Sequence, residues 1–106
     1  MRLIIPHSKP KQEVKAAVER SIVQVFTGFN VGPIEFIKQQ KQWSGDTMIF
    51  ALTAKLGFLQ TPINGSASVT DSELILDVDL GLFGKLISEE TARTEITGRT
   101  KALLKK

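Results

Sequence analysis

The fold is decided by residues 43–54, WSGDTMIFALTA, in which a turn signal precedes a run of alternating side chains. The Ser-Gly-Asp segment at 44–46 is rich in residues that favour turns. After it, apolar side chains occupy every second position, at Met48, Phe50, Leu52 and Ala54. A period of two places these four side chains on one face of a strand. Residues 34–43 also alternate in part, so the stretch predicts a β-hairpin whose tip is 43–46.

Three further strands are predicted around this hairpin. Residues 63–70 and 73–80 both alternate, and the turn residues Asp71 and Ser72 separate them. Connections this short indicate antiparallel neighbours. Leu3–Ile5 is a short aliphatic run closed by Pro6, which cannot donate a hydrogen bond to a neighbouring strand. That run is therefore typical of a strand at the edge of a sheet.

Two helices flank the strands. Residues 12–26 carry apolar side chains at spacings of three and four, which place them on one helical face. Ser8 is the expected N-cap, Gly28 the expected C-cap, and Lys15 can pair with Glu19 one turn away. A second helix is predicted from Ser88, its N-cap, to residue 104, with an internal Gly98.

The predicted order is β-α-β-β-β-β-α over one domain, residues 1–106. One strongly apolar sheet face and two apolar helical stripes must be buried together. We therefore expect an α+β two-layer sandwich, with a mainly antiparallel sheet of about four to five strands and two helices packed on one face.

Composition excludes several classes of protein. The 106 residues are 42% apolar and 24% charged, as in ordinary globular domains. There is no cysteine, which excludes disulfides, thiolate metal sites and cysteine nucleophiles. The net charge of +3 does not single out a nucleic acid, and none is expected as a partner. No apolar run approaches the roughly 20 residues that span a bilayer, so we expect a cytoplasmic protein.

Few residues suggest catalysis. His7 is the only histidine, and Asp77 and Asp79 share one strand face, so a hydrolase using His7 with either carboxylate is one hypothesis. A lone histidine is more often a turn residue, and paired carboxylates more often form a solvated strand face. Phosphate-binding glycine loops and nucleophile elbows are absent from the sequence. We therefore predict a non-enzymatic protein with no catalytic residue, no cofactor and no metal site.

Two connections are apolar where polar residues are expected: LGFL at 56–59 and GLFGKLI at 81–87. They can cover the open end of the core, or they can form a contact patch for a partner, a homodimer mate or a lipid-like or polymer surface. The candidate contact residues are Leu56, Phe58, Leu82, Phe83 and Leu86.

The chain resembles the small bacterial proteins grouped as polyhydroxyalkanoic acid system proteins. The resemblance runs nearly end to end and is carried by short pieces: Ile5-Pro6-His7, Trp43 to Met48 with Phe50, Leu56-Gly57-Phe58, Pro62 to Gly65, Val78-Asp79-Leu80 and Leu82-Phe83. None is an active-site signature, and the family offers no catalytic residues to carry over. The resemblance implies a bacterial cytoplasm and proximity to polyester storage inclusions.

These observations lead to one principal functional expectation and one alternative. The principal expectation is an accessory or regulatory protein associated with polyhydroxyalkanoate granules, which binds the granule surface or a granule-bound protein. The alternative is a domain that binds a small hydrophobic ligand, such as a lipid or a hydroxy acid, between the sheet and the helices.

Overall fold

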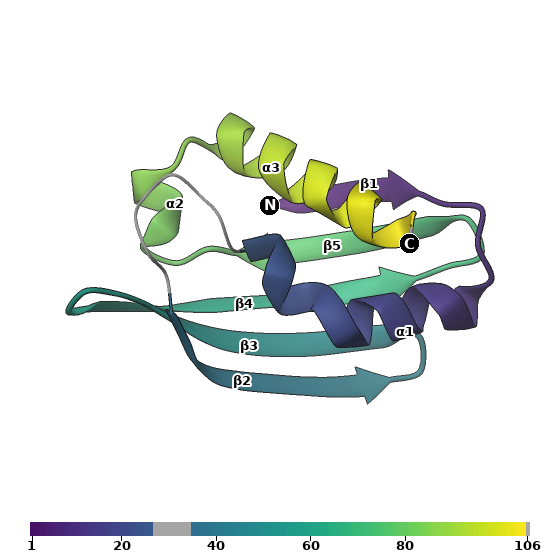
Figure 1. The fold of residues 1–106 in the computed structure, drawn as a ribbon, viewed down its shortest axis with the longest axis horizontal. Coiled ribbons are helices and arrows are strands. Elements are labelled where there is room, and N and C mark those ends of the chain that lie inside the picture. Colours follow the sequence, from purple (N-terminus) through teal and green to yellow (C-terminus); the bar gives the residue numbers. More distant parts are fainter. Residues whose placement is uncertain (27–34, 106) are drawn as a thin grey trace.

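The described residues form a five-stranded antiparallel sheet with two long helices on one face, as the sequence predicts (Figure 1). The computed structural model describes residues 1–26 and 35–105, without the side chains of residues 83 and 86. The strands are β1 (Arg2–Pro6), β2 (Glu35–Ser44), β3 (Thr47–Leu56), β4 (Leu59–Val69) and β5 (Glu73–Asp79). The helices are α1 (Lys11–Ser21), the 3₁₀ helix η1 (Ile22–Phe26), α2 (Phe83–Leu86) and α3 (Glu89–Leu104).

The strands lie in the order β1-β5-β4-β3-β2. β2 to β5 follow one another as antiparallel neighbours, whereas β1 pairs with β5, with Arg2 opposite Asp77 and Pro6 opposite Glu73. β1 and β2 therefore occupy opposite edges of the sheet, and α1 lies between them in the chain. The predicted edge position of β1 is confirmed.

The core lies between the sheet and the helices, and the alternation of the strands places it there. Met48, Phe50, Leu52 and Ala54 of β3 are all buried, as are Ile63, Ala67 and Val69 of β4 and Leu74, Leu76 and Val78 of β5. Phe50 contacts Phe26 of η1, with ring centroids 5.8 Å apart. Its ring also lies against Gly65 of β4, where a side chain would collide with it. The glycine thus leaves room for an aromatic ring above the sheet.

The helix ends differ in part from the prediction. Ser88 is the N-cap of α3, as predicted, and its hydroxyl accepts a hydrogen bond from the Thr91 amide at 3.1 Å. Ser8 is not the N-cap of α1. That position belongs to Pro10, whose extended backbone (ψ 142°) delays the helix until Lys11. The expected C-cap, Gly28, lies outside the described residues.

Two short helices were not predicted as such. The first helix changes from α to 3₁₀ geometry at Ile22, where β-branched residues begin to dominate the sequence. The apolar segment 81–87 contains the four-residue helix α2. Among the described helices, none is both long enough and apolar enough to cross a membrane.

Candidate contact surface

The two apolar connections lie at the same end of the sheet, at the left in Figure 1. The β3–β4 hairpin extends past the last residue of β5, because Asn64 is opposite Asp79 and β4 begins five residues earlier. The β5–α3 connection folds over this part of β4. There the Leu82 amide donates a hydrogen bond to the buried hydroxyl of Thr61, at 2.8 Å. Gly81 has a positive φ of 59° and packs against Thr61 and Pro62.

The tip of the β3–β4 hairpin presents Phe58 to solvent. Leu56 and Leu59 are the last and first residues of their strands, so the apparent connection is a two-residue turn at Gly57 and Phe58. The positive φ of Gly57, 63°, followed by a negative φ at Phe58, is the signature of a type II′ turn. Phe58 is 100% exposed, whereas Leu56 packs against the core.

The β5–α3 connection is anchored at both ends and exposed between them. Leu80 and Ile87 are each only 9% exposed and belong to the core, whereas Leu82 is 41% exposed. The side chains of Phe83 and Leu86 lie outside the described part of the structure. Of the five candidate contact residues, the structure thus places Phe58 and Leu82 at the surface and Leu56 at the margin of the core.

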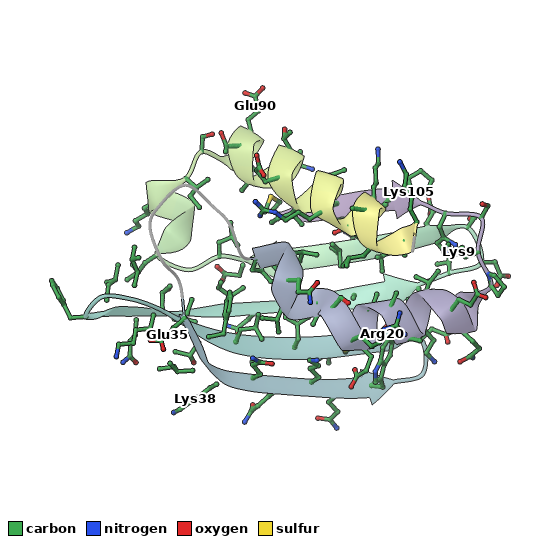
Figure 2. The ribbon with its side chains drawn as sticks, viewed as in Figure 1. Lys9, Arg20, Glu35, Lys38, Glu90 and Lys105 are labelled. Atoms are coloured by element: carbon green, nitrogen blue, oxygen red, sulfur yellow. The ribbon has the colours of Figure 1, made fainter. Side chains whose placement is uncertain are left out.

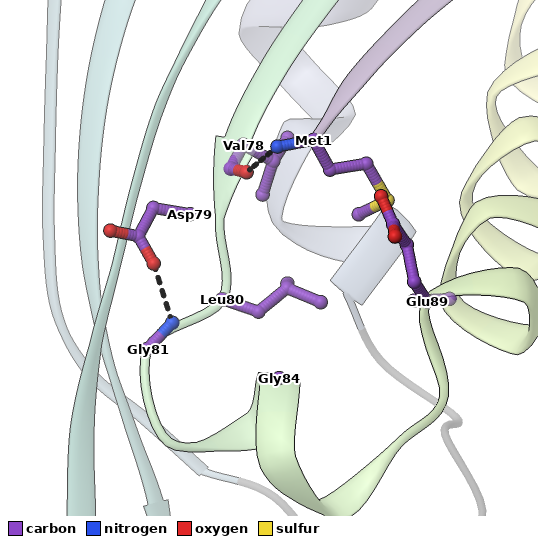
Figure 3. A pocket seen from close by; sticks show the side chains of 8 residues that line it. Met1, Val78, Asp79, Leu80, Gly81, Gly84 and Glu89 are labelled. Carbon is purple, nitrogen blue, oxygen red and sulfur yellow. Dashed lines mark hydrogen bonds between the residues drawn. The ribbon is translucent and has the colours of Figure 1, made fainter.

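A pocket of about 450 Å³ lies beside this connection, and sequence reasoning missed it (Figure 3). Its lining comes from the end of β5, the Gly81–Gly84 segment, the first turn of α3 and Met1. Val78, Leu80 and Ala92 supply apolar lining, and the carboxylates of Asp79 and Glu89 lie among them. The Gly81 amide donates a hydrogen bond to Asp79 at 2.9 Å. The volume is within the usual range for small-ligand sites.

The void that the described residues enclose between sheet and helices is far smaller. The void found there, beneath α1 and α3, measures about 10 Å³, which is no more than one water molecule needs. This void is too small for the hydrophobic ligand that the sequence places there, whereas the open pocket has room for one.

His7 does not meet either aspartate. Its Nδ1 accepts a hydrogen bond from the Lys9 amide at 3.2 Å, so Nε2 carries the proton and donates to the Thr70 carbonyl at 2.9 Å. His7 follows the end of β1 and lies five residues from Arg2, the partner of Asp77, which corresponds to roughly 17 Å of extended chain. The hydrolase hypothesis based on His7 with Asp77 or Asp79 is therefore wrong.

Both aspartates are used locally. Arg2 binds Asp77 through two hydrogen bonds of 3.1 and 3.2 Å, which hold the pKa of that carboxyl below its ordinary value. Asp79 accepts the Gly81 amide and so fixes the start of the β5–α3 connection.

The motif at 43–46 has a structural role at the opposite end of the sheet. Asp46 binds Lys11 at 2.9 Å and Lys15 at 3.3 Å, and the indole of Trp43 donates to Glu19 at 3.0 Å. We call these five residues the hairpin clasp. They fasten the β2–β3 turn to α1, so this one of the pieces that carry the family resemblance has a structural role.

Comparison of the chain with family models, with curated proteins and with solved structures gave no match. The association with polyester granules therefore stays a prediction that rests on the resemblance described above.

Proposed function

We propose that the protein is a non-enzymatic accessory domain that binds a hydrophobic surface through the tip of its β3–β4 hairpin, and that this surface belongs to a polyhydroxyalkanoate granule or a granule-bound protein. The supporting observation is the complete exposure of Phe58. A phenylalanine at a tight turn, beyond the end of the neighbouring strand, can enter an apolar surface without disturbing the core.

The contact is expected to be reversible. Burial of one phenylalanine side chain contributes about 1.5–3 kcal/mol, and partial burial of Leu82 adds to this. The exposed Lys85 in the same connection suits a surface with anionic groups. A single insertion of this strength produces weak binding, which becomes substantial only where the surface offers a high density of sites.

The pocket beside α2 supports the alternative function, with a restriction on its ligand. Asp79 and Glu89 lie in its lining, so the carboxylate of a fatty acid or hydroxy acid would be repelled there. An apolar ligand with an uncharged or cationic head group fits the pocket better.

The test is partition of the purified, fluorescently labelled protein between buffer and isolated polyhydroxyalkanoate granules. We expect saturable enrichment of the wild-type protein, and a loss of about tenfold or more for Phe58→Ser. The matched control is Ile49→Ser, which removes another exposed apolar side chain (59% exposed) from the open face of the sheet.

Equal partition of Phe58→Ser and wild type would contradict the hairpin contact, provided that circular dichroism shows both to be folded. Absence of wild-type enrichment would contradict granule binding itself. In that case native mass spectrometry of the purified protein would test the pocket, because a retained small molecule would add a defined mass.

A further inference from the structure

The two edges of the sheet differ in their protection. β1 has five residues, ends at Pro6, and has its Arg2 carbonyl bound by the Arg93 side chain of α3 at 2.8 Å. Each of these features hinders the addition of another strand. β2 has ten residues and no proline. Among the described residues, no backbone hydrogen bond reaches β2 from any element other than β3.

The turn geometry shows which backbone groups of β2 point away from β3. The β2–β3 turn has a positive φ of 62° at Gly45 and a negative φ at Asp46, so it is also of type II′. Such a turn closes with a hydrogen bond between its flanking residues, Ser44 and Thr47. Bonding pairs then recur at every second residue of an antiparallel ladder. The intervening residues of β2 direct their N–H and C=O groups away from β3, namely Gln39, Lys41 and Trp43.

The charge pattern of β2 allows a second copy of the same strand to pair with it in a register that opposes no two lysines directly. In a continuous antiparallel sheet, two directly opposite residues point to the same face. The two-fold axis that relates the two copies must therefore lie between one residue of β2 and the same residue of the partner subunit. An axis at Lys41 would oppose two lysines. An axis at Gln40 instead places Lys38 opposite the partner subunit's Gln42 and Lys41 opposite the partner subunit's Gln39.

Most of the side chains around Gln40 are uncharged. Gln39, Gln40 and Gln42 are exposed and uncharged, and Gln40 can hydrogen-bond with its own copy across the axis. Lys38 extends away from the ribbon of β2 (Figure 2). The irregularity between Phe36 and Lys38 limits the regular pairing to the part of β2 that follows it.

We propose that the protein forms a homodimer in which the β2 strands of two copies pair antiparallel about Gln40, so that two five-stranded sheets become one ten-stranded sheet. The helices of both copies then lie on the same face. This surface is separate from Phe58, so the proposal holds or fails independently of granule binding.

The first test is sedimentation velocity of the full chain over a wide range of concentration. We expect a concentration-dependent dimer. Gln40→Lys should raise its dissociation constant about fivefold, because it opposes two ammonium groups at the axis. Gln42→Glu should lower the constant, since each new carboxylate faces the partner subunit's Lys38. The matched control Asn64→Lys adds the same charge on central strand β4 and should leave the constant unchanged.

The second test locates the register chemically. The chain has no cysteine, so Gln40→Cys introduces a single thiol that meets its own copy at the axis. Paired residues at such a non-hydrogen-bonded position have Cα atoms about 4.5 Å apart, which permits a disulfide. Under mild oxidation, Gln40→Cys should give covalent dimers and Asn64→Cys should not.

Three results would overturn the proposal. A wild-type protein that stays monomeric at millimolar concentration excludes the dimer. Equal effects of Gln40→Lys and Asn64→Lys exclude the β2 edge, and equal cross-linking of the two cysteine variants excludes the register.

Discussion

At the residue scale, the hairpin clasp shows how charged side chains choose tertiary partners over local ones. The sequence predicts a Lys15–Glu19 pair across one turn of α1. In the structure Lys15 instead binds Asp46 and lies 5.1 Å from the centre of the Trp43 ring, while Glu19 accepts the indole N–H of that tryptophan. The hairpin tip supplies a carboxylate, a ring and an N–H donor together, and no local spacing within α1 could reveal that.

Replacing Asp46 with Asn should lower stability in a pH-dependent way. Hydrogen bonds from Lys11 and then Lys15 hold the pKa of Asp46 below its ordinary value. A folded-state pKa below that of the unfolded state adds stability that is fully present above the ordinary value, about 4, and is lost as the pH falls through the folded pKa. Urea unfolding should therefore show a lower midpoint for Asp46→Asn at pH 7 and a smaller difference near pH 3.

The control for this prediction is Asp71→Asn. The Asp71 carboxylate is 3.9 Å from Lys11 but 95% exposed, so solvent screens the contact and the midpoint should not change. A pH-independent difference between Asp46→Asn and wild type would show that the ion pairs add nothing.

Replacing Gly65 with Ala should destabilise the protein by about 1–3 kcal/mol. A methyl group there would collide with the Asp77 carbonyl oxygen and lie 2.7 Å from the Phe50 ring. Gly98→Ala is the matched control, because nothing lies within 4 Å of its new methyl group. In the middle of α3 that change should stabilise by about 0.5–1 kcal/mol, and chemical denaturation measures both. If the two variants have the same stability, the close packing of Phe50 on Gly65 is not maintained in solution.

At the scale of elements, the spacing of apolar residues and the turn residues predict the sheet well. They do not predict how far a hairpin extends past the neighbouring strand. The alternation of apolar and polar side chains identifies the strands because one face of the sheet is buried. The pattern is lost where no neighbouring element covers that face. The apolar LGFL segment predicts a connection, although Leu56 and Leu59 belong to strands. Whether Phe58 is exposed depends on how far the hairpin extends past β5, and a single sequence carries no signal for that. The pocket beside α2 is equally invisible in the sequence, because distant segments line it.

The connection between β5 and α3 should depend on the hydroxyl of Thr61. Thr61→Val keeps the shape of the side chain but leaves the Leu82 amide without its acceptor, at a cost of about 1–3 kcal/mol. Hydrogen exchange should accelerate in residues 81–87 and stay unchanged in β3. Thr61→Ser restores the acceptor and should recover most of the protection. Unchanged exchange in Thr61→Val would mean that water replaces the hydroxyl.

At the scale of the whole molecule, burial on one face of the sheet leaves other surfaces available for contacts. The helices cover one face and Arg93 protects the β1 edge, whereas no other described element covers the hairpin tip or pairs with the β2 edge (Figure 1). These two surfaces lie outside the core cluster that contains Phe26 and Phe50. Contacts at the surface can therefore change with little effect on folding.

Two phenylalanines test this separation. Phe58 is 100% exposed and Phe50 is 1% exposed. Phe58→Ser should change the free energy of unfolding by no more than about 0.5 kcal/mol, since it breaks no packed contact. Phe50→Leu should cost about 1–3 kcal/mol, because the smaller side chain leaves a gap between Phe26 and Gly65. Urea denaturation at low protein concentration measures both without interference from dimers. A large loss of stability in Phe58→Ser would mean that Phe58 packs against the protein in solution, and the hairpin tip would then not be the contact surface.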